Sequence, residues 1–443
     1  TEGLPIDVRF MLPSCVPATP MDESGANLDY RAIDSFYDYP RVQGLAEMMN
    51  AYGVIHNDKE VVSKIVAAQA HHKKIDGHAP GLQGKDLDTY VAAGVYSDHE
   101  CATMEDALAK LQRGQFIMIR EGTAARNLEA LAPLLTPQYA ERCMFCTDDK
   151  HPSDLLEKGH IDYIAREAIN KYGVDPIIAV KAACHHASRY FLLNNRGAIA
   201  PGYLADFAVI DNFKDFNVEM VFKKGVLYWN NGELRDFEAP KIEEYLDKRA
   251  HDTFHVSTLT PDDFRDTRQR GVLGMVPGEI ITTDNGYADH VDLEKDILKI
   301  AVVERHKGTH HIGLGYIQGY GLKSGAVATS ISHDSHNIIV VGTNSADMAF
   351  AANYIVEHHG GIVVVENGTV KGSVVLEIAG IMSDRPLTEV NDQLEAAKDA
   401  AFTLGVSRGI DPFMTLSFMA LPVIPKLRIT TRGVVDVDTQ QYV

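Results

Sequence analysis

Two stretches, KKIDGHAPG (residues 73–81) and GVYSDHE (residues 94–100), join a short apolar run to an end rich in ionisable groups. Four similar stretches lie around them: VRFMLPSCVP (8–17), VQGLAEMM (42–49), GQFIMIREG (114–122) and RCMFCTDD (142–149). Amphipathic segments separate the stretches, among them DKEVVSKIVAAQAHHK (58–73) and TMEDALAKLQRG (103–114), which opens on a capping-box pattern. This alternation is typical of parallel strands joined by helical crossovers, so we predict six such strands.

The last five of these predicted strands each end in a group capable of chemistry: Glu47, His78, His99, Glu121 and Asp148. In a closed βα barrel, the carboxyl ends of the strands form the face that carries the active site. A single His or Asp near a strand end is more often a capping or core-edge group. The repetition of such groups at successive strand ends favours an active site instead. Because six strands cannot close an eight-stranded barrel, we expect two further strands ahead of this sequence.

The rest of the chain predicts two more structural regions. Residues 175–193 have the pattern of a long helix, and an alternating, turn-rich segment after it predicts a small antiparallel β unit. Residues 235–265 are charged and irregular, as in a linker, and strands mix with helices from about residue 270 onward. The predicted class is α/β: a (β/α)8 barrel with its first two strands missing, a small β domain and an α+β carboxy-terminal domain. The expected boundaries are 1–180 for the partial barrel, 181–250 for the barrel-end helix, small β domain and linker, and 251–443 for the last domain.

The composition restricts the partners of the protein. A formal net charge of −19 repels nucleic acids and anionic membranes, so we expect neither as a partner. The sequence has no apolar run long enough to span a bilayer, and its first residues do not resemble a signal peptide. Five cysteines are too few for a disulfide framework, and the Cys143 and Cys146 pair has no second pair to complete a zinc site. We expect buried, reduced thiols and a cytoplasmic location.

The strand-end groups form a hard ligand set of imidazoles and carboxylates, which suits divalent iron, manganese or zinc. A second polar cluster, SHDSHN (332–337), brings His333, Asp334 and His336 together after three glycines and a strand-like AVATSIS. Two interpretations compete for this cluster. It either caps a following helix, or it forms a loop that covers the barrel mouth and binds substrate or metal.

Several motifs of the sequence resemble those of one family. The stretches that resemble the successive barrel motifs of bacterial adenine deaminases, in the amidohydrolase superfamily, are LPSCVPATPMDESGA (12–26), GLAEMMNAYGVI (44–55), DGHAPGLQGKDLDTYVAAGVYSDHE (76–100), REGTAARNL (120–128) and TDDKHPSDLLEKGHIDYI (147–164). The segment GAIAPGYLADFAVI (197–210) is similar to the amidohydrolase return from barrel to β domain. The stretches that resemble the adenine deaminase carboxy-terminal domain are GYGLKSGAVATSISHDSHNIIVVGT (319–343), AGIMSDRP (379–386) and FMTLSFMALPVIPKLRITTRGVVDV (413–437).

The resemblance implies a (β/α)8 metal-dependent hydrolase barrel with strands 3–8 present in this sequence. It also implies a binuclear metal centre of Mn²⁺ or Fe²⁺, with Zn²⁺ as an alternative. The bridging carboxylate of the fourth strand falls on Glu47, the histidines of the fifth and sixth strands fall on His78 and His99, and the aspartate of the eighth strand falls on Asp148. The His-x-His pair of the first strand has no counterpart in this sequence. We therefore expect an additional amino-terminal segment, or a separate chain, to carry that pair.

The reaction implied is the hydrolytic deamination of adenine to hypoxanthine and ammonia, as in purine salvage, by a metal-activated hydroxide that attacks C6. Asp148 would take the proton of the water and deliver it to the departing ammonia, and either Glu100 or Glu121 would protonate the ring nitrogen. We expect a homo-oligomer whose ligand is a small purine. The sequence lacks the H-x-E and P-C-x-x-C signature of the small zinc deaminases.

Two other functions stay open. One is the hydrolysis of a cyclic amide, although enzymes of that kind commonly bridge their metals with a modified lysine where this chain has Glu47. The other is a catalytically incomplete or partner-dependent homologue, because the first-strand ligands are absent from this sequence. The presence of a His-x-His on a further segment would distinguish an active enzyme from the second alternative.

Overall fold

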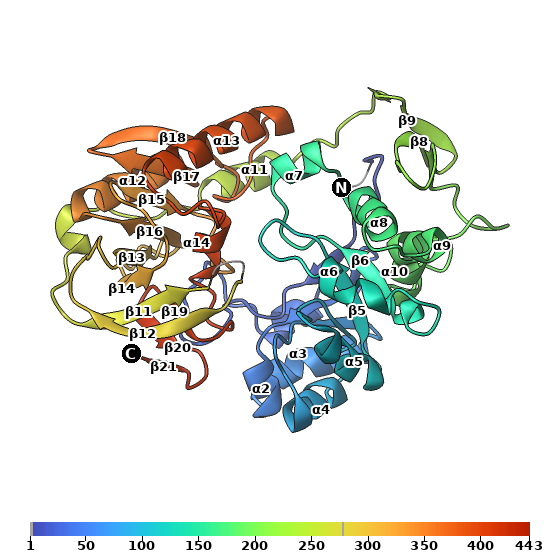
Figure 1. Ribbon diagram of the computed structural model, residues 1–443, viewed down its shortest axis with the longest axis horizontal. Helices are drawn as coiled ribbons and strands as arrows, with labels where there is room; N and C mark the ends of the chain where they lie inside the picture. The colour runs from blue at the N-terminus through green and yellow to red at the C-terminus, as the bar shows by residue number, and fades with distance from the viewer. Residues whose placement is uncertain (1–2, 277–278) are drawn as a thin grey trace. The chain divides into compact units, whose positions relative to one another are not determined.

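The computed structural model describes residues 3–276 and 279–443 (Figure 1). The chain forms two compact units. Unit 1 consists of Thr1–Ser14 and Leu28–Lys241, and unit 2 consists of Cys15–Asn27 and Ile242–Val443. Each unit has its own buried apolar core. The division of the chain into three domains stays a prediction.

The first part of unit 1 is built on six short strands, one in each stretch that predicted a strand. Their bounds are β1 (Phe10–Leu12), β2 (Val42–Met48), β3 (Lys74–Gly77), β4 (Ser97–Asp98), β5 (Phe116–Arg120) and β6 (Cys143–Cys146). They form two parallel sheets, with the orders β1-β2-β3 and β4-β5-β6. Between β3 and β4 the ladder is interrupted, although the Tyr96 amide still donates to the Ile75 carbonyl at 2.9 Å. That the six strands belong to an eight-stranded barrel stays a prediction.

Helices connect these strands, as a parallel arrangement requires. The helices of unit 1 are α1 (Tyr30–Asp34), α2 (Ala51–Ile55), α3 (Lys59–Ala70), α4 (Gly84–Ala92), α5 (Met104–Gln112), α6 (Leu128–Leu131), α7 (Pro152–Glu157), α8 (Ile161–Asn170), α9 (Pro176–Val180) and α10 (His186–Tyr190). The Thr103 side chain caps α5 by accepting a hydrogen bond from the Asp106 amide at 3.2 Å. Across the residues described in both units, no helix is both long enough and apolar enough to cross a membrane.

The end of unit 1 contains the expected antiparallel sheet. Its strands are β7 (Phe207–Ile210), β8 (Val218–Lys223), β9 (Val226–Asn230) and β10 (Glu233–Leu234), in the order β10-β9-β8-β7. The linker expected over residues 235–265 is more regular than its sequence indicates. It contains α11 (Glu244–His251), a helix that buries no side chain, and a 3-10 turn at Pro261–Phe264. Its large apolar side chains, Tyr245 and Leu246, are exposed. The charged residues around them gave this segment the composition of a linker.

Unit 2 is organised around an eight-stranded sheet in the order β12-β11-β14-β13-β16-β15-β17-β18. Its strands are β11 (Arg270–Met275), β12 (Thr282–Ala288), β13 (Ile297–Val303), β14 (Ile312–Gln318), β15 (Ala326–Thr329), β16 (Ile338–Gly342), β17 (Gly361–Glu366) and β18 (Thr369–Val375). A smaller antiparallel sheet follows, made of β19 (Leu427–Thr430), β20 (Gly433–Asp436) and β21 (Gln441–Tyr442). Unit 2 thus contains both strands and helices, and the α+β class of the carboxy-terminal domain stays a prediction.

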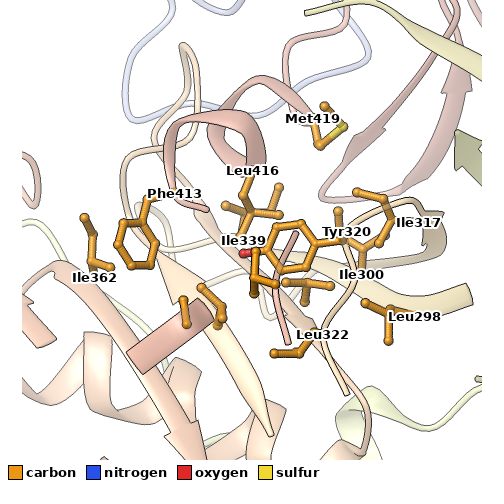
Figure 2. Close-up of a cluster of buried hydrophobic side chains, with 14 of the residues drawn as sticks. Leu298, Ile300, Ile317, Tyr320, Leu322, Ile339, Ile362, Phe413, Leu416 and Met419 are labelled. Atoms are coloured by element: carbon orange, nitrogen blue, oxygen red, sulfur yellow. The ribbon is translucent and has the colours of Figure 1, made fainter. Parts of the chain in front are cut away.

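The large sheet has an apolar core on each face. Alternate residues of its central strands therefore belong to different cores. One core combines Ile300, Ile339 and Ile362 of the sheet with α13 (Leu387–Thr403) and α14 (Met414–Phe418) (Figure 2). The other core combines their chain neighbours Ala301, Val340 and Val363 with α12 (Ser345–Glu357). Side chains alternate across a strand, so a strand buried on both faces must be apolar throughout. This requirement accounts for the runs NIIVV and GIVVV in the sequence.

An early segment of the chain, Cys15–Asn27, belongs to unit 2 although it lies between β1 and α1 of unit 1. We call it the strap. The Glu23 carboxylate of the strap accepts hydrogen bonds from Thr431 and from Arg432, and contacts His311 at 3.0 Å. The Ser335 hydroxyl donates to the buried carboxylate of Asp22. These contacts join the strap to residues that follow it by about three hundred positions or more in the sequence.

Candidate metal centre

The residues expected to bind metal lie where parallel strands of unit 1 end. Glu47 is next to last in β2, His78 directly follows β3, His99 directly follows β4, and Asp148 lies two residues after β6. Because all these strands are parallel, their carboxyl ends share one edge. The sequence therefore delivers four ionisable side chains to one end of the strands.

Three of these side chains form a compact group. The Glu47 Oε2 atom lies 3.2 Å from His78 Nδ1 and 3.0 Å from His99 Nε2. One ligand atom from each of Glu47, His78 and His99 can be chosen so that all lie within 4.8 Å of one another. Two imidazoles and a carboxylate at this separation can surround a divalent cation.

A second group shares His99 with the first and adds Glu100 and Asp148. The Glu100 Oε1 atom lies 3.2 Å from His99 Nε2 and 3.3 Å from His78 Nδ1. Glu100 was expected from the sequence only as a proton donor, and the structure places it among the candidate ligands. Both Glu100 and His99 reach the cluster because β4 ends at Asp98, so the strict alternation of strand side chains ends there too.

An arginine that we did not predict from the sequence lies in the same cluster. Arg120, the last residue of β5, donates from Nη1 and Nη2 to the two Glu100 oxygens at 2.6 and 2.8 Å. Its Nη1 atom also donates to Asp148 Oδ2 at 2.5 Å. The guanidinium thereby fixes the orientation of two carboxylates at once. The sequence signal for it is a cation at the end of the apolar run FIMIR.

Glu121, the next residue, lies outside both ligand groups. Its carboxylate accepts a hydrogen bond from the Leu128 amide at 3.2 Å, at the start of α6, and burial raises its pKa. Consecutive residues at the end of a strand point in opposite directions. Arg120 faces the cluster and Glu121 therefore faces the helix.

The cluster is held by opposite charges. Burial on its own would raise the pKa of Glu47, but hydrogen bonds and attraction from His78 and His99 outweigh it and hold that pKa well below its ordinary value. Burial would likewise lower the pKa of His99, but Glu100 and Glu47 raise it well above its ordinary value. A cation that entered this site would replace the imidazole protons as the source of positive charge.

The residues present fit a divalent cation. The donors are imidazole nitrogens and carboxylate oxygens, the set that suits manganese, iron and zinc. His78 turns Nδ1 toward the carboxylates of Glu47 and Glu100. Its buried Nε2 has no hydrogen-bond partner in the described parts of the chain. The ring is therefore oriented through the nitrogen that points at the candidate site.

The thiols of the CxxC pair do not belong to this ligand set. Cys143 is buried and Cys146 is partly buried, and burial raises the pKa of both thiols to about 12. Thiols with such a high pKa are unreactive near neutral pH. This agrees with the buried structural role expected for them.

The histidine loop, residues 332–337, lies in unit 2 and is ordered by its own neighbours. His333 stacks on Phe418 with ring centroids 4.7 Å apart, and His333 Nδ1 lies 3.1 Å from the Asp334 carboxylate. The backbone amide of Ser332 donates to His336 Nδ1 at 3.3 Å. The element after the loop is strand β16, so the loop does not cap a following helix. A role in substrate binding for His333, Asp334 and His336 stays a prediction.

The comparisons with known proteins show the class to which the chain belongs. Residues 1–228 match the model of the amidohydrolase family, and residues 279–441 match that of the adenine deaminase C-terminal domain. The chain therefore belongs to the amidohydrolase family and, within it, to the adenine deaminases. This confirms the family resemblance of the sequence motifs.

Named relatives match along the whole chain. The adenine deaminases of Desulfatibacillum aliphaticivorans and of Nitratidesulfovibrio vulgaris strain DP4 are each 45% identical to it, over 100% of this chain and 78% of the relative. Adenine deaminase 2 of Carboxydothermus hydrogenoformans is 42% identical over 99% of this chain and 78% of the relative. The similarity therefore covers both compact units.

Proposed function

We propose that the chain catalyses the hydrolytic deamination of adenine to hypoxanthine and ammonia. The observation that carries the proposal is similarity to adenine deaminases along the whole chain, together with a ligand cluster at the strand ends. An unmodified carboxylate, Glu47, stands where cyclic amide hydrolases commonly carry a modified lysine. This makes hydrolysis of a cyclic amide the weaker alternative.

We propose a binuclear site for Mn²⁺ or Fe²⁺, with Zn²⁺ as an alternative. Two ligand groups that share His99 support two neighbouring cation positions, one near Glu47 and His78 and one near Glu100 and Asp148. A bound divalent cation lowers the pKa of a coordinated water from 15.7 toward about 7 and so supplies a nucleophile at neutral pH. The partner-dependent alternative rests on the absence of a His-x-His from the sequence.

The side chains of the cluster suit the proton transfers of deamination. Asp148 is one-third exposed and is held by Arg120 through a single oxygen, so its other oxygen can accept a proton from water. Passing that proton to the departing ammonia is general acid–base catalysis by one carboxylate. Of the two candidates for ring protonation, Glu100 lies in the cluster, whereas Glu121 is bonded to the start of α6. We therefore favour Glu100.

Three further proposals complete this function. The six parallel strands would form part of a (β/α)8 barrel, and the protein would act as a homo-oligomer in the cytoplasm. The histidine loop would contact purine or metal through His333, Asp334 or His336. A His336→Ala variant tests the last point: turnover should fall, and unchanged turnover would assign the loop a purely structural role.

The test of the reaction is ammonia release from adenine, with hypoxanthine identified by its absorbance. The 443-residue chain is assayed beside the same chain joined to the first-strand segment of a relative that carries His-x-His. We expect activity in the joined chain, its loss on chelation and its recovery with Fe²⁺ or Mn²⁺. A joined chain that binds metal but releases no ammonia from adenine would contradict the proposed substrate.

The role of Asp148 is tested by Asp148→Asn in the active form. We expect the metal content to remain close to that of the parent and turnover to fall about 10²–10⁴-fold, the usual contribution of a general acid–base group. Metal content measured on the same sample separates a lost ligand from a lost proton carrier. Near-normal turnover would place the proton transfer on another group.

A further inference from the structure

The two histidines of the candidate metal centre follow strands that are not joined by a regular ladder. His78 follows β3 and His99 follows β4, and these strands belong to different sheets. In a continuous sheet, backbone hydrogen bonds set the distance between neighbouring strand ends. Here a backbone hydrogen bond from Tyr96 to Ile75 joins the two strands three residues before each histidine. The regular ladder does not continue to His78 and His99, whose ring centroids lie 5.5 Å apart.

The side chain of Asp98 bridges this interruption. Asp98 is the last residue of β4 and is completely buried. Its Oδ1 atom accepts a hydrogen bond from the Ala79 amide at 2.8 Å, and its Oδ2 atom accepts one from the Glu100 amide at 2.9 Å. Ala79 directly follows His78, and Glu100 directly follows His99. One carboxylate therefore binds the backbone beside both histidines.

Lys110 of α5 completes the bridge from the other side. Its ammonium group, also completely buried, donates to Asp98 Oδ2 at 3.0 Å and to the Ala79 carbonyl at 2.8 Å. A third bond, at 3.1 Å, reaches Asp106 on the same helix. The residue after His78 is thus held at its amide by Asp98 and at its carbonyl by Lys110.

We propose that Asp98 is a positioning residue that, together with Lys110, sets the distance between His78 and His99. This inference rests on the proposed function only in taking these two histidines as metal ligands. A buried ion pair by itself is weak evidence for stability, since well-packed apolar residues often replace one without loss. Both Asp98 oxygens, however, bind backbone groups adjacent to a candidate ligand. Packing without directed hydrogen bonds would not fix those positions.

The first test is Asp98→Asn in the full chain. An amide has a single oxygen, so it cannot accept from the Ala79 amide on one side and from the Glu100 amide and Lys110 on the other. We expect amide exchange at Ala79 or Glu100 to accelerate about tenfold in the metal-free protein, as the loss of a hydrogen bond to a charged group implies. We expect Mn²⁺ affinity to fall about 10–100-fold, the usual effect of disturbing the groups that orient metal ligands.

The matched control is Asp206→Asn. Asp206, also in unit 1, accepts hydrogen bonds from Arg196, Lys223 and the Lys224 amide. This change therefore also removes a carboxylate held by cations and backbone amides, with two cations and one amide where Asp98 has one cation and two amides. Asp206 lies outside both ligand groups. We expect the control to lower the melting temperature without changing Mn²⁺ affinity. An Asp98→Asn variant that behaves in the same way would overturn the proposal.

Asp98→Glu covers the case in which Asp98→Asn does not fold. It keeps the charge and the partnership with Lys110, but the added methylene cannot place both oxygens against the same two amides. We expect a folded protein with weakened Mn²⁺ affinity and an altered Mn²⁺ electron paramagnetic resonance spectrum. Parent-like affinity and spectrum would contradict positioning by Asp98. Because these measurements do not involve adenine, they stand even if the proposed substrate is wrong.

Discussion

The interrupted strands of unit 1 and the continuous sheet of unit 2 are held in place by different means. In unit 2, β13 pairs with β14 and with β16 along nearly its whole length, and aliphatic side chains fill both faces of the sheet. In unit 1, the ladder breaks between β3 and β4, and the buried Asp98 and Lys110 side chains cross the break. Backbone ladders and apolar packing stabilise one region, whereas directed polar contacts arrange the other.

The apolar core of unit 2 suits stability, whereas the polar strand ends of unit 1 suit chemistry. A core of alternating aliphatic residues leaves no polar atom to perform a reaction, but it buries a large apolar area. The strand ends of unit 1 bring Glu47, His78, His99 and Arg120 together, a cluster of polar groups whose burial costs desolvation energy. We therefore expect substitutions at the strand ends of unit 1 to affect function first, and substitutions in the sheet core of unit 2 to affect stability first.

The largest effect should come from His99→Ala. His99 is the residue that the two ligand groups share, so its loss weakens both candidate cation positions. We expect metal to be lost and adenine turnover to fall to background, because water without a bound cation keeps its pKa near 15.7. Metal analysis, turnover and the far-ultraviolet circular dichroism spectrum are measured on one preparation. Parent-like turnover in this variant would contradict the proposed metal centre.

Unit 2 contains an exception to its apolar character, the buried carboxylate of Asp22. Burial raises the pKa of Asp22 to about 7, despite hydrogen bonds from Ser335 and the Glu23 amide. The folded protein therefore retains a proton that the unfolded chain releases near pH 4. Stability should fall as the pH rises from about 4 to about 7 and be constant, for this group, above that range. Since each pKa unit is worth about 1.4 kcal/mol, the loss should approach about 4 kcal/mol.

The check is the free energy of unfolding at pH 5 and pH 8 for the parent and for Asp22→Asn. The variant has no proton to release at this position, so its pH dependence should be smaller than that of the parent in this range. Equal pH dependence in both proteins would show that another group titrates instead.

Ile339→Ala tests the packing of unit 2 directly. Ile339 is completely buried in the core shown in Figure 2. We expect a loss of about 3 kcal/mol in the free energy of unfolding, since removal of buried methylene groups costs the transfer energy and leaves a cavity. The single tryptophan of the sequence, Trp229, lies in β9 of unit 1, so its fluorescence reports on that unit.

The circular dichroism transition of Ile339→Ala should therefore move to lower denaturant concentration, while the Trp229 fluorescence transition and Mn²⁺ affinity stay unchanged. A common shift of both transitions would mean that the two units unfold together. That result would contradict the assignment of stability mainly to unit 2 and of function mainly to unit 1.

The smallest effect should be that of Thr103→Ala at the start of α5, the helix that carries Lys110. The change removes the hydrogen bond to the Asp106 amide and should cost about 1 kcal/mol. Thr103→Ser keeps a hydroxyl and should restore most of the loss. Denaturant unfolding of the three proteins gives the comparison, and equal stability of all three would show that the cap contributes nothing.

The parallel strands of unit 1 and their reactive ends could be predicted from local pattern. Short strand-like stretches mark β2, β3 and β4, and Glu47, His78 and His99 stand where those stretches end. The choice between neighbours was harder. The sequence places Arg120 and Glu121 at the same strand end, but only the side-chain direction shows that Arg120 joins the cluster.

Other features had no local signal at all. Asp98 and Lys110 are ordinary charged residues in the sequence, and their complete burial depends on the meeting of β4 with α5. The stretch MDESGA (21–26) has the composition of an exposed loop, yet Asp22 in it is buried against Ser335. Contacts between residues so far apart in the chain do not appear in any short window of sequence.

The strap also restricts the order in which unit 2 can fold during synthesis. Glu23 is synthesised 409 residues before its partner Arg432. Ser14, the residue just before the strap, donates a hydrogen bond to the Glu47 carbonyl at 2.5 Å. The strap therefore begins next to the end of β2, which carries the candidate ligand Glu47. Contacts between residues this far apart form slowly, and the last folding steps of unit 2 must follow the synthesis of Arg432. Because the chain passes from one unit to the other three times, a single cut cannot release either unit with all of its parts.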